Sequence, residues 1–270
     1  MRILIATGGA PHSDAAVRMG GFIAEATDAS FTLLTVIKNE SARVQAESIL
    51  TRAATLLPPG ALPQKKIRLG QPAAQIVREV RESNHDMLIL GERVHHGLAK
   101  RILAPTVEKV LEQMPCPVLI ARGQVRPPKR LLVCEGGRDP SLLHRLIAQL
   151  SALLTAAEML TVLHVMSQMA AGPGVEGWEL RADAEELMEE HTPEGKLLEQ
   201  DMERLAALSV KPEAKVRHGL VVTEILNEAR SGDYDVVVIG AHQGKRWERF
   251  LLDDLAQEIV DHADRPVLVV

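Results

Sequence analysis

Aromatic residues are scarce in this chain of 270 residues, which has three phenylalanines, two tryptophans and one tyrosine. Proteins that recognise unpaired nucleic acid stack its bases on aromatic side chains. With an aromatic content of only 2%, we expect no nucleic-acid partner. Leucine, isoleucine, valine, alanine and methionine must fill the core, and a hydrophobic content of 46% is enough for them to do so.

Long apolar runs are also absent. The existing runs are short, as in DVVVIGA at 235–241, whereas a membrane-spanning helix needs about 20 apolar residues. The first strand-like run begins at Arg2, so we expect no signal peptide. The only two cysteines, Cys116 and Cys134, lie in apolar strand-like segments, which is typical of buried thiols in the reducing cytosol. The sequence thus predicts a cytoplasmic protein without a membrane span.

The chain does contain a repeat of itself. ILIATGG at 3–9 matches LLVCEGG at 131–137, and TLLTVI from Thr32 matches TVLHVM from Thr161. Further along, RLGQPAAQIVREV from Arg68 matches RHGLVVTEILNEA from Arg217. The offset rises from 129 (161 minus 32) to 149 (217 minus 68). We therefore predict two homologous domains with one insertion in the second copy, at about 167–191.

The boundary between the copies falls in RGQVRPPKR, where Pro127 and Pro128 stop a strand or helix from continuing. This predicts domains at 1–126 and 127–270. Within each copy, short β-branched runs alternate with amphipathic segments such as AAQIVREVRES at 73–83. Strands that are apolar on both faces and separated by helices predict a parallel sheet covered on both sides. Each domain is therefore expected to be a five-stranded, doubly wound α/β unit. In the first domain the strands are expected near 2–7, 31–37, 64–68, 86–91 and 117–121.

Four segments together resemble the universal stress protein family, with one family domain in each half. They are the opening strand followed by Gly-Gly, the strand DMLILG with its copy DVVVIG, the segment GLAKRIL, and the closing strand PCPVLI. The resemblance implies a Rossmann-like fold, similar to the adenine nucleotide α-hydrolases, with sheet order 3-2-1-4-5. It also implies that the domains pair through their final strands, here as a pseudo-dimer within one chain.

Doubly wound sheets bind ligands beyond the carboxyl ends of their strands, where the strand order reverses. In each half this point is the crevice between the first and fourth strands. The candidate binding residues of the first crevice are Ala6, Thr7, Gly8, Gly9, Val36, Gly91, Arg93, Val94, Lys100, Ala104 and Pro105. Those of the second crevice are Glu135, Gly136, Gly240, Gln243, Asp253 and Asp254.

The first crevice departs from the phosphate-binding pattern. ATP-binding members of the family have glycine, two residues, glycine, nine residues, then glycine and a hydroxyl residue. Here only Gly91 matches, because Val94, Ala104 and Pro105 take the other places. Valine resists positive φ, and proline has no N–H to offer a phosphate. Thr7 also stands where family members often have aspartate. The region nevertheless remains basic, through Arg93, His95, His96, Lys100 and Arg101.

The second crevice departs further. Gln243, Asp253 and Asp254 replace the second glycine and the final pair, and Glu135 only approximates the aspartate. At roughly 5 Å and an effective dielectric constant near 20, each carboxylate repels a phosphate charge by about 3 kcal/mol. We predict that Asp254 caps the following helix, with Gln257 as its capping-box partner. This crevice is then filled by the protein itself and is empty of nucleotide.

The two halves differ in charge. Residues 1–126 hold 16 basic and 11 acidic residues, which leaves 15 of the 31 basic and 25 of the 36 acidic residues to 127–270. The difference favours docking of the halves on each other, or an acidic face for a basic partner. Much of the acid lies in WELRADAEELMEEH at 178–191, an expected helix whose role the sequence leaves open. Thr192 and Pro193 are expected to cap and start the next helix.

These features favour a non-enzymatic stress-response protein with degenerate nucleotide sites. We expect it to act through contacts with an unidentified protein partner, with homo-oligomers as a further option. A regulatory module that binds ATP or AMP in the first crevice, with slow hydrolysis at most, is the alternative, as is a binder of another small molecule there. Adjacent histidines such as His95 and His96 rarely bind one ion, so we predict no metal site. We also predict no catalytic residue.

Overall fold

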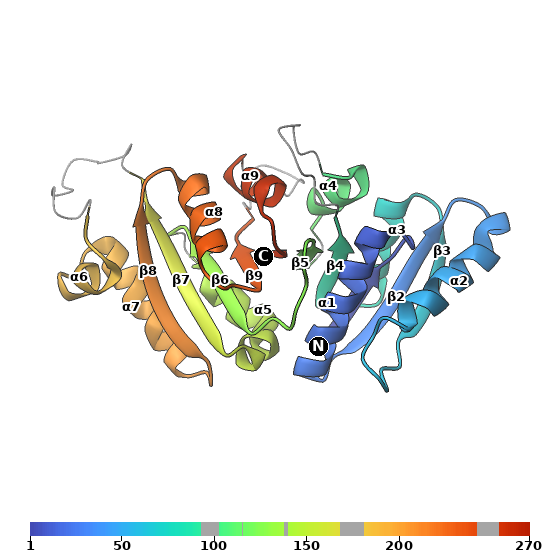
Figure 1. Ribbon diagram of the computed structural model, residues 1–270, viewed down its shortest axis with the longest axis horizontal. Helices are drawn as coiled ribbons and strands as arrows, with labels where there is room; N and C mark the ends of the chain where they lie inside the picture. Colours follow the sequence, from blue (N-terminus) through green and yellow to red (C-terminus); the bar gives the residue numbers. More distant parts are fainter. Residues whose placement is uncertain (93–102, 115, 138–139, 168–180, 242–253) are drawn as a thin grey trace. The chain divides into compact units, whose positions relative to one another are not determined.

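The computed structural model describes residues 1–92, 103–114, 116–137, 140–167, 181–241 and 254–270 (Figure 1). The chain divides into two compact units. Unit 1 contains Met1–Pro128 together with Asp264–Val269, and unit 2 contains Lys129–Gly240 together with Asp254–Ala263. No helix among the described residues is long and apolar enough to cross a membrane.

Unit 1 is a doubly wound sheet. Its strands are β1 (Arg2–Ala6), β2 (Ser30–Ile37), β3 (Gln64–Leu69), β4 (Met87–Gly91) and β5 (Val118–Ala121). They run parallel in the order β3-β2-β1-β4-β5, so the predicted order 3-2-1-4-5 is confirmed for this unit. The short strand β10 (Val267–Val269) lies antiparallel to β5 in the same unit.

The helices of unit 1 cover both faces of its sheet (Figure 1). They are α1 (Pro11–Thr27), the short 3₁₀ turn η1 (Glu40–Ala42), α2 (Arg43–Ala54), α3 (Pro72–Glu82) and α4 (Pro105–Leu111). Because parallel crossovers are right-handed, α1 and α2 take one face, and α3 and α4 take the other. Strand β1 is therefore enclosed on both sides, and its residues Ile3, Leu4 and Ile5 are fully buried.

Unit 2 repeats this plan. Its strands are β6 (Arg130–Glu135), β7 (Met159–Met166), β8 (Lys211–His218) and β9 (Val236–Ile239). They run parallel in the order β9-β6-β7-β8. The helices are α5 (Leu142–Ala156), α6 (Ala184–Glu189), α7 (Pro193–Ala206), α8 (Val221–Ser231) and α9 (Asp254–His262). The register Thr161–Glu213 between β7 and β8 reproduces the register Thr32–Gln64 between β2 and β3, as the sequence repeat predicts.

The predicted insertion lies partly outside the described residues, but its final part forms α6. Asp183 and Glu186 form a capping box at the start of this helix, which is shorter than the helix expected at 178–191. Leu187 is fully buried in a cluster with Met166 and Ala182, so α6 packs on its own unit. The expected cap of α7 is confirmed, because the Thr192 hydroxyl accepts a hydrogen bond from the Gly195 N–H at 3.0 Å.

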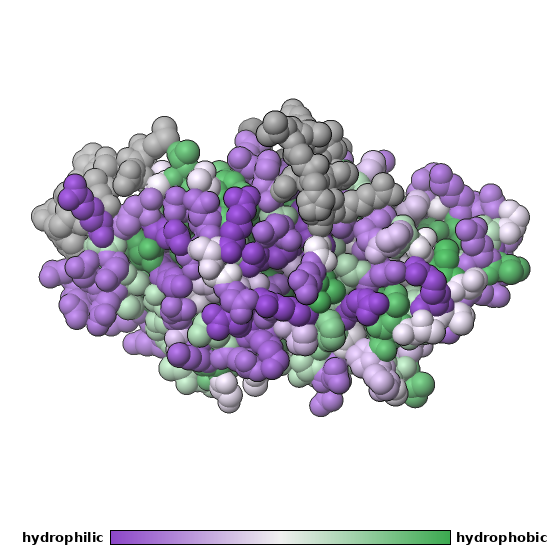
Figure 2. Space-filling view, viewed as in Figure 1, coloured by the Kyte–Doolittle hydropathy of each residue, from purple (hydrophilic) through white to green (hydrophobic). Residues whose placement is uncertain are grey.

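The surface carries no broad apolar patch on the face shown in Figure 2, where hydrophobic residues lie in small groups among hydrophilic ones. Among the described residues the exposed large hydrophobic side chains are Val44, Leu62, Leu69, Leu220 and Leu255. Single exposed residues of this kind are normal. Only Leu62 is almost wholly exposed, at 92%.

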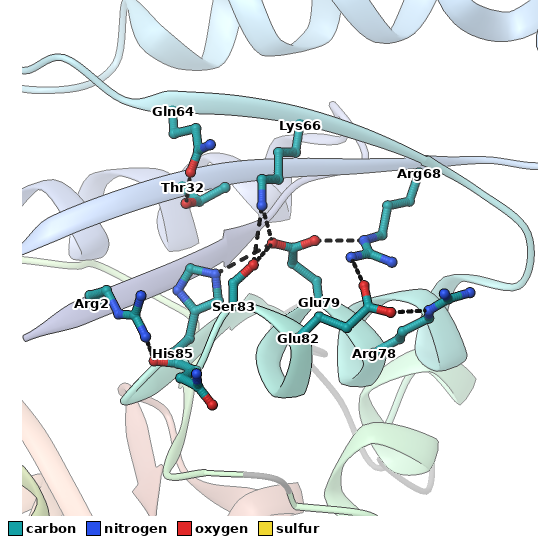
Figure 3. A network of polar contacts seen from close by, with 11 residues as sticks. Arg2, Thr32, Gln64, Lys66, Arg68, Arg78, Glu79, Glu82, Ser83 and His85 are labelled. Atoms are coloured by element: carbon teal, nitrogen blue, oxygen red, sulfur yellow. Dashed lines mark hydrogen bonds and ion pairs between the residues drawn. The ribbon is translucent and has the colours of Figure 1, made fainter.

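A buried carboxylate joins β3 to α3 in unit 1 (Figure 3). Glu79 is fully buried and accepts hydrogen bonds from Lys66 Nζ at 2.7 Å, Arg68 Nε at 2.6 Å and Ser83 Oγ at 2.7 Å. The buried carboxylate is thereby paired with two cations, as a buried ion requires a partner. We call Lys66, Arg68, Glu79 and Ser83 the Glu79 network.

Unit 2 has the same arrangement around Glu228. This carboxylate accepts from Lys215 Nζ at 3.2 Å, Arg217 Nε at 2.6 Å and the Tyr234 hydroxyl at 2.7 Å. Lys215, Arg217 and Glu228 each lie 149 positions after their counterparts in the Glu79 network. The strand-to-helix ion network is thus part of the repeated unit, and it fixes α3 and α8 to their sheets.

Candidate functional site

A cavity of about 250 Å³ lies at the carboxyl ends of β1, β2 and β4 in unit 1. The predicted crevice residues that line it are Ala6, Thr7, Gly8, Val36, Gly91 and Ala104. Sequence reasoning missed the other residues of its wall, which are Ala10, His12, Ser13, Leu34, Pro72, Ile76, Leu90, Thr106 and Val107. Gly9 and Pro105 do not line the cavity, and Arg93, Val94 and Lys100 lie outside the described residues.

The cavity wall is mostly aliphatic, and its volume is just below the roughly 300 Å³ at which typical small-molecule sites begin. Its polar side chains are partly engaged. The Thr7 hydroxyl accepts from the Gly9 N–H at 3.2 Å, and the Thr7 carbonyl accepts from the Thr35 hydroxyl at 2.9 Å. Thr7 therefore stabilises its own loop, and its hydroxyl and carbonyl oxygens already accept hydrogen bonds within the protein.

The start of α4 offers few free N–H groups. The Ala104 N–H donates to Glu92 Oε2 at 2.9 Å, and Pro105 is the first residue of the helix. The Val107 N–H donates to the Ala104 carbonyl at 2.8 Å. Glu92, which follows β4 directly and is 4% exposed, thus brings a carboxylate to the place where a phosphate would need donors. In the sequence, the only indication of this role of Glu92 is that an acidic residue directly follows Gly91.

Gly91 has a packing role that the sequence pattern did not reveal. A Cβ at this position would lie 2.2 Å from the His12 carbonyl oxygen and 2.8 Å from Ser13 Cα. Both are backbone atoms of the first turn of α1. The glycine therefore lets α1 pack closely on β4, and its presence does not by itself indicate phosphate binding.

In unit 2, the Glu135 carboxylate binds backbone N–H groups after β6 and at the start of α5. It accepts from the Gly136 N–H at 3.0 Å and from the Leu143 N–H, in the first turn of α5, at 3.2 Å. Glu135 is 4% exposed. Burial raises the pKa of Glu135, and the nearby charge of Asp201 raises it further. A carboxylate of the protein thus occupies the N–H groups that an anionic ligand would use.

The other predicted residues of the second crevice lie at or next to the edge of the described residues. Asp254 is the first described residue of helix α9, and Gln257 donates through Nε2 to Asp261 Oδ1 at 3.1 Å. The capping box of Asp254 with Gln257 stays a prediction, because the residues directly before Asp254 lie outside the described residues. Gly240 faces Arg145, whose Nη2 would lie 2.7 Å from an added Cβ. Gln243 and Asp253 lie outside the described residues.

Unit 2 has a further cavity of about 460 Å³ between the loop after β6 and α7. Ser141, which lines it, caps α5 by accepting from the His144 N–H and also donates to the buried Asp201 at 3.3 Å. Arg204 donates to Asp201 at 2.7 Å. His164 lies with Nδ1 3.1 Å from the Glu135 carbonyl, and burial lowers its pKa. These groups bind one another rather than forming a nucleophile with its base.

Metal and thiol chemistry have little support in the part of the chain that the structure describes. No group of three or more histidine, cysteine, aspartate or glutamate side chains there could hold a metal ion. Cys116 and Cys134 are free and partly buried. Burial raises the pKa of both thiols, that of Cys116 to about 12. Because the thiolate is the reactive form, neither is suited to act as a nucleophile at neutral pH.

Comparison with solved structures supports the fold. A universal stress protein from Archaeoglobus fulgidus is 17% identical, with 99% of this chain and 97% of that chain covered and a TM-score of 0.67. A functionally unknown protein from Pseudomonas aeruginosa is 18% identical, with 100% and 92% covered and a TM-score of 0.68. The cytoplasmic domain of a prokaryotic cation chloride cotransporter is 12% identical, with 99% and 94% covered and a TM-score of 0.52.

These identities are low, so the likenesses show the fold and leave the function open. No curated protein matches the chain. The family assignment comes from the sequence itself, since residues 1–122 and again residues 129–270 match the Universal stress protein family. Both halves of the repeat are thus accounted for, and the chain belongs to the universal stress protein family as a tandem of two family domains.

Proposed function

We propose that this universal stress protein acts through contacts with other proteins and does not catalyse a reaction. Its two crevices no longer hold a nucleoside triphosphate. The observation that carries this proposal is the use of the donors at the start of α4. The Ala104 N–H is bound to Glu92, Pro105 has no N–H, and the Val107 N–H is bound to the Ala104 carbonyl. A triphosphate placed there would have to displace a buried carboxylate.

The second crevice supports the same proposal. The Glu135 carboxylate already uses the N–H groups of Gly136 and Leu143. A phosphate would compete with it for these donors and would be repelled by its charge. In this proposal the first crevice is a vestigial nucleotide site. The second crevice is filled by side chains of the protein.

A second candidate function is binding of a small molecule in the unit 1 cavity, with ATP or AMP as the family-based choice. The observation in its favour is the cavity itself, because a mostly aliphatic wall with a few polar groups is typical of ligand sites. The residues Arg93 and Lys100 would supply positive charge in this case. No cofactor is required by the leading proposal.

Isothermal titration with ATP, ADP and AMP separates the two candidates. We expect no binding at micromolar nucleotide, since that affinity needs about −8 kcal/mol and, among the described residues at the start of α4, the N–H groups of Ala104 and Val107 are occupied and Pro105 has none. A Val94→Gly/Ala104→Gly/Pro105→Ser variant restores the family pattern, and we expect it to bind ATP more tightly than the unchanged protein. Micromolar affinity in the unchanged protein, lost in Arg93→Ala/Lys100→Ala, would instead establish the nucleotide-binding function.

We further propose that the domains 1–126 and 127–270 pair through their final strands in the cytoplasm. The antiparallel register of β5 with β10, in which Leu119 lies opposite Leu268, supports this. Directly opposed residues of antiparallel strands have Cα atoms about 4.5–5.5 Å apart, which a disulfide can bridge.

A Leu119→Cys/Leu268→Cys variant, made with Cys116→Ser and Cys134→Ser, tests this pairing. We expect one intramolecular disulfide under oxidising conditions, detected by peptide mapping without reductant. The two single-cysteine variants serve as controls for disulfides between molecules. Cross-links that form only between molecules would contradict pairing within one chain.

A further inference from the structure

A second cavity of unit 1, of about 360 Å³, lies at the amino-terminal ends of β1, β2 and β3, the opposite end of these strands from the crevice. Its wall combines donors with apolar groups and includes no carboxylate side chain. The residues that matter here are Arg2, Phe31, Leu62, Ser83 and His85. The volume falls within the range of small-molecule sites, roughly 300–1,000 Å³.

His85 is a buried imidazole without a hydrogen bond. It is 8% exposed, and neither of its ring nitrogens has a hydrogen-bond partner. Nε2 lies 3.6 Å from Glu79 Oε1, which is an ion-pair distance only if the ring is protonated (Figure 3). Buried polar groups without partners are uncommon and cost roughly 1–3 kcal/mol. The described residues therefore give the ring nitrogens no hydrogen-bond partner, and a ligand could supply one.

In unit 2 a tyrosine fills the equivalent position. Tyr234 lies 149 positions after His85, and Gly232 lies 149 positions after Ser83. The Tyr234 hydroxyl donates to the buried Glu228 at 2.7 Å, and the ring is 3% exposed. A Cβ on Gly232 would lie 2.1 Å from this ring, so glycine is what makes room for tyrosine.

Unit 1 has the opposite combination. Ser83 replaces the glycine and donates to Glu79 Oε1 at 2.7 Å, which is the bond that the tyrosine hydroxyl makes in unit 2. The carboxylate is thus satisfied without His85. The smaller imidazole leaves space beside it, and its nitrogens remain without hydrogen bonds. The pair Ser83 and His85 therefore keeps the network intact while it opens a cavity.

We propose that this cavity binds a small organic acid, with its carboxylate at Arg2 and His85 and its apolar body against Phe31 and Leu62. The Arg2 guanidinium has five N–H donors, of which Nη2 is bound to the Asn84 carbonyl at 2.7 Å. Leu62 is 92% exposed, and a ligand body at the mouth of the cavity would cover it. Binding of a carboxylate by arginine beside an apolar wall would use the further donors of Arg2 and would cover the exposed Leu62.

Binding is coupled to uptake of a proton by His85. Because Nε2 faces the Glu79 carboxylate, the neutral ring carries its hydrogen on Nε2, and Nδ1 can only accept. Nδ1 can donate to a ligand carboxylate once the ring is protonated. Burial lowers the pKa of His85, Glu79 opposes this, and Arg2 and Lys66 add to it. A bound carboxylate adds a second negative charge beside the ring, so affinity is expected to rise as pH falls from about 8 to about 6.

Titration of the full chain with benzoate tests the proposal, with benzyl alcohol as the uncharged probe. We expect saturable binding of benzoate, tighter at about pH 6 than at about pH 8, and a shift of the His85 ring resonances in NMR spectra. Benzyl alcohol is expected to bind at least tenfold more weakly. Leu62→Ser is expected to weaken benzoate binding without changing its pH dependence.

The matched variant is Ser83→Gly/His85→Tyr, which introduces the unit 2 combination into unit 1. We expect it to keep the melting temperature of the unchanged protein and to lose benzoate binding. If benzoate does not bind at either pH, the cavity is a solvent-filled space and the proposal is wrong. Equal binding of benzoate by the double variant, or of benzyl alcohol by the unchanged protein, would also overturn it. None of these three outcomes bears on the first crevice, which lies at the carboxyl ends of the strands, opposite this cavity.

Discussion

Glu79→Gln is expected to lower the free energy of unfolding of the first half by about 3 kcal/mol. The substitution keeps the shape of the side chain but removes its charge, and the two cations that face it remain. Lys66 and Arg68 lie 2.7 Å and 2.6 Å from the carboxylate oxygens, and Glu79 is fully buried. The cost arises because two partly buried cations, with side chains 31% and 19% exposed, lose their counter-charge, and because the amide NH₂ group cannot accept the bonds of the oxygen that it replaces.

Glu82→Gln is the matched control. Glu82 lies on the same helix and also contacts Arg68, but its side chain is 46% exposed, so its removal is expected to cost less than about 1 kcal/mol. Urea unfolding followed by circular dichroism gives both values. A Glu79→Gln effect no larger than that of Glu82→Gln would show that the Glu79 network contributes little to stability.

The pH dependence of stability gives an independent measure of the same network. Burial raises the pKa of Glu79, but the hydrogen bonds from Lys66, Ser83 and Arg68 outweigh it and lower the pKa from 4.5 to about 2. A folded-state pKa below that of the unfolded chain means that the stabilisation is fully present above pH 4.5. It is lost as pH falls toward 2. The difference in stability between the unchanged protein and Glu79→Gln should therefore shrink over this interval.

The internal repeat made the fold predictable from the sequence. Two copies whose offset makes only one large change, from 129 to 149 at the insertion, are expected to adopt the same structure, and alternating apolar runs and amphipathic segments restrict that structure to a parallel sheet between helices. The order β3-β2-β1-β4-β5 itself came from the family resemblance. The Glu79 network was also visible in principle, because Lys66, Arg68 and Glu79 recur at offset 149. Paired charges on a strand, with a carboxylate on the next helix in both copies, indicate a contact between the two elements.

The candidate site was less predictable. The sequence pattern showed which glycines and hydroxyl residues were missing, but it did not show where each backbone N–H points. The hydrogen bond from the Ala104 N–H to Glu92 and that from the Gly136 N–H to Glu135 depend on those directions. The cavity beside His85 could not be predicted either, because it depends on the space that the His85 ring leaves next to Ser83.

Gly91→Ala is expected to destabilise the first half by about 3 kcal/mol. The added methyl group would lie 2.2 Å from the His12 carbonyl oxygen and 2.8 Å from Ser13 Cα. Both contacts are with backbone, so no side chain can rotate away, and α1 must move from β4 by an ångström or more. The strand residues beneath α1, such as Ile5, are fully buried, and this movement would loosen their packing.

Gly8→Ala is the matched control, because no heavy atom lies within 4 Å of a Cβ at that position. Gly8 also lines the unit 1 cavity, so the two variants differ in packing rather than in distance from the site. We expect Gly8→Ala to change the free energy of unfolding by less than about 0.5 kcal/mol. If Gly91→Ala were as well tolerated as Gly8→Ala, close packing could not explain why this glycine is present. Its place in the phosphate-binding pattern would then be the better explanation, and the proposal that the crevice has lost its nucleotide would rest on the donors at the start of α4 alone.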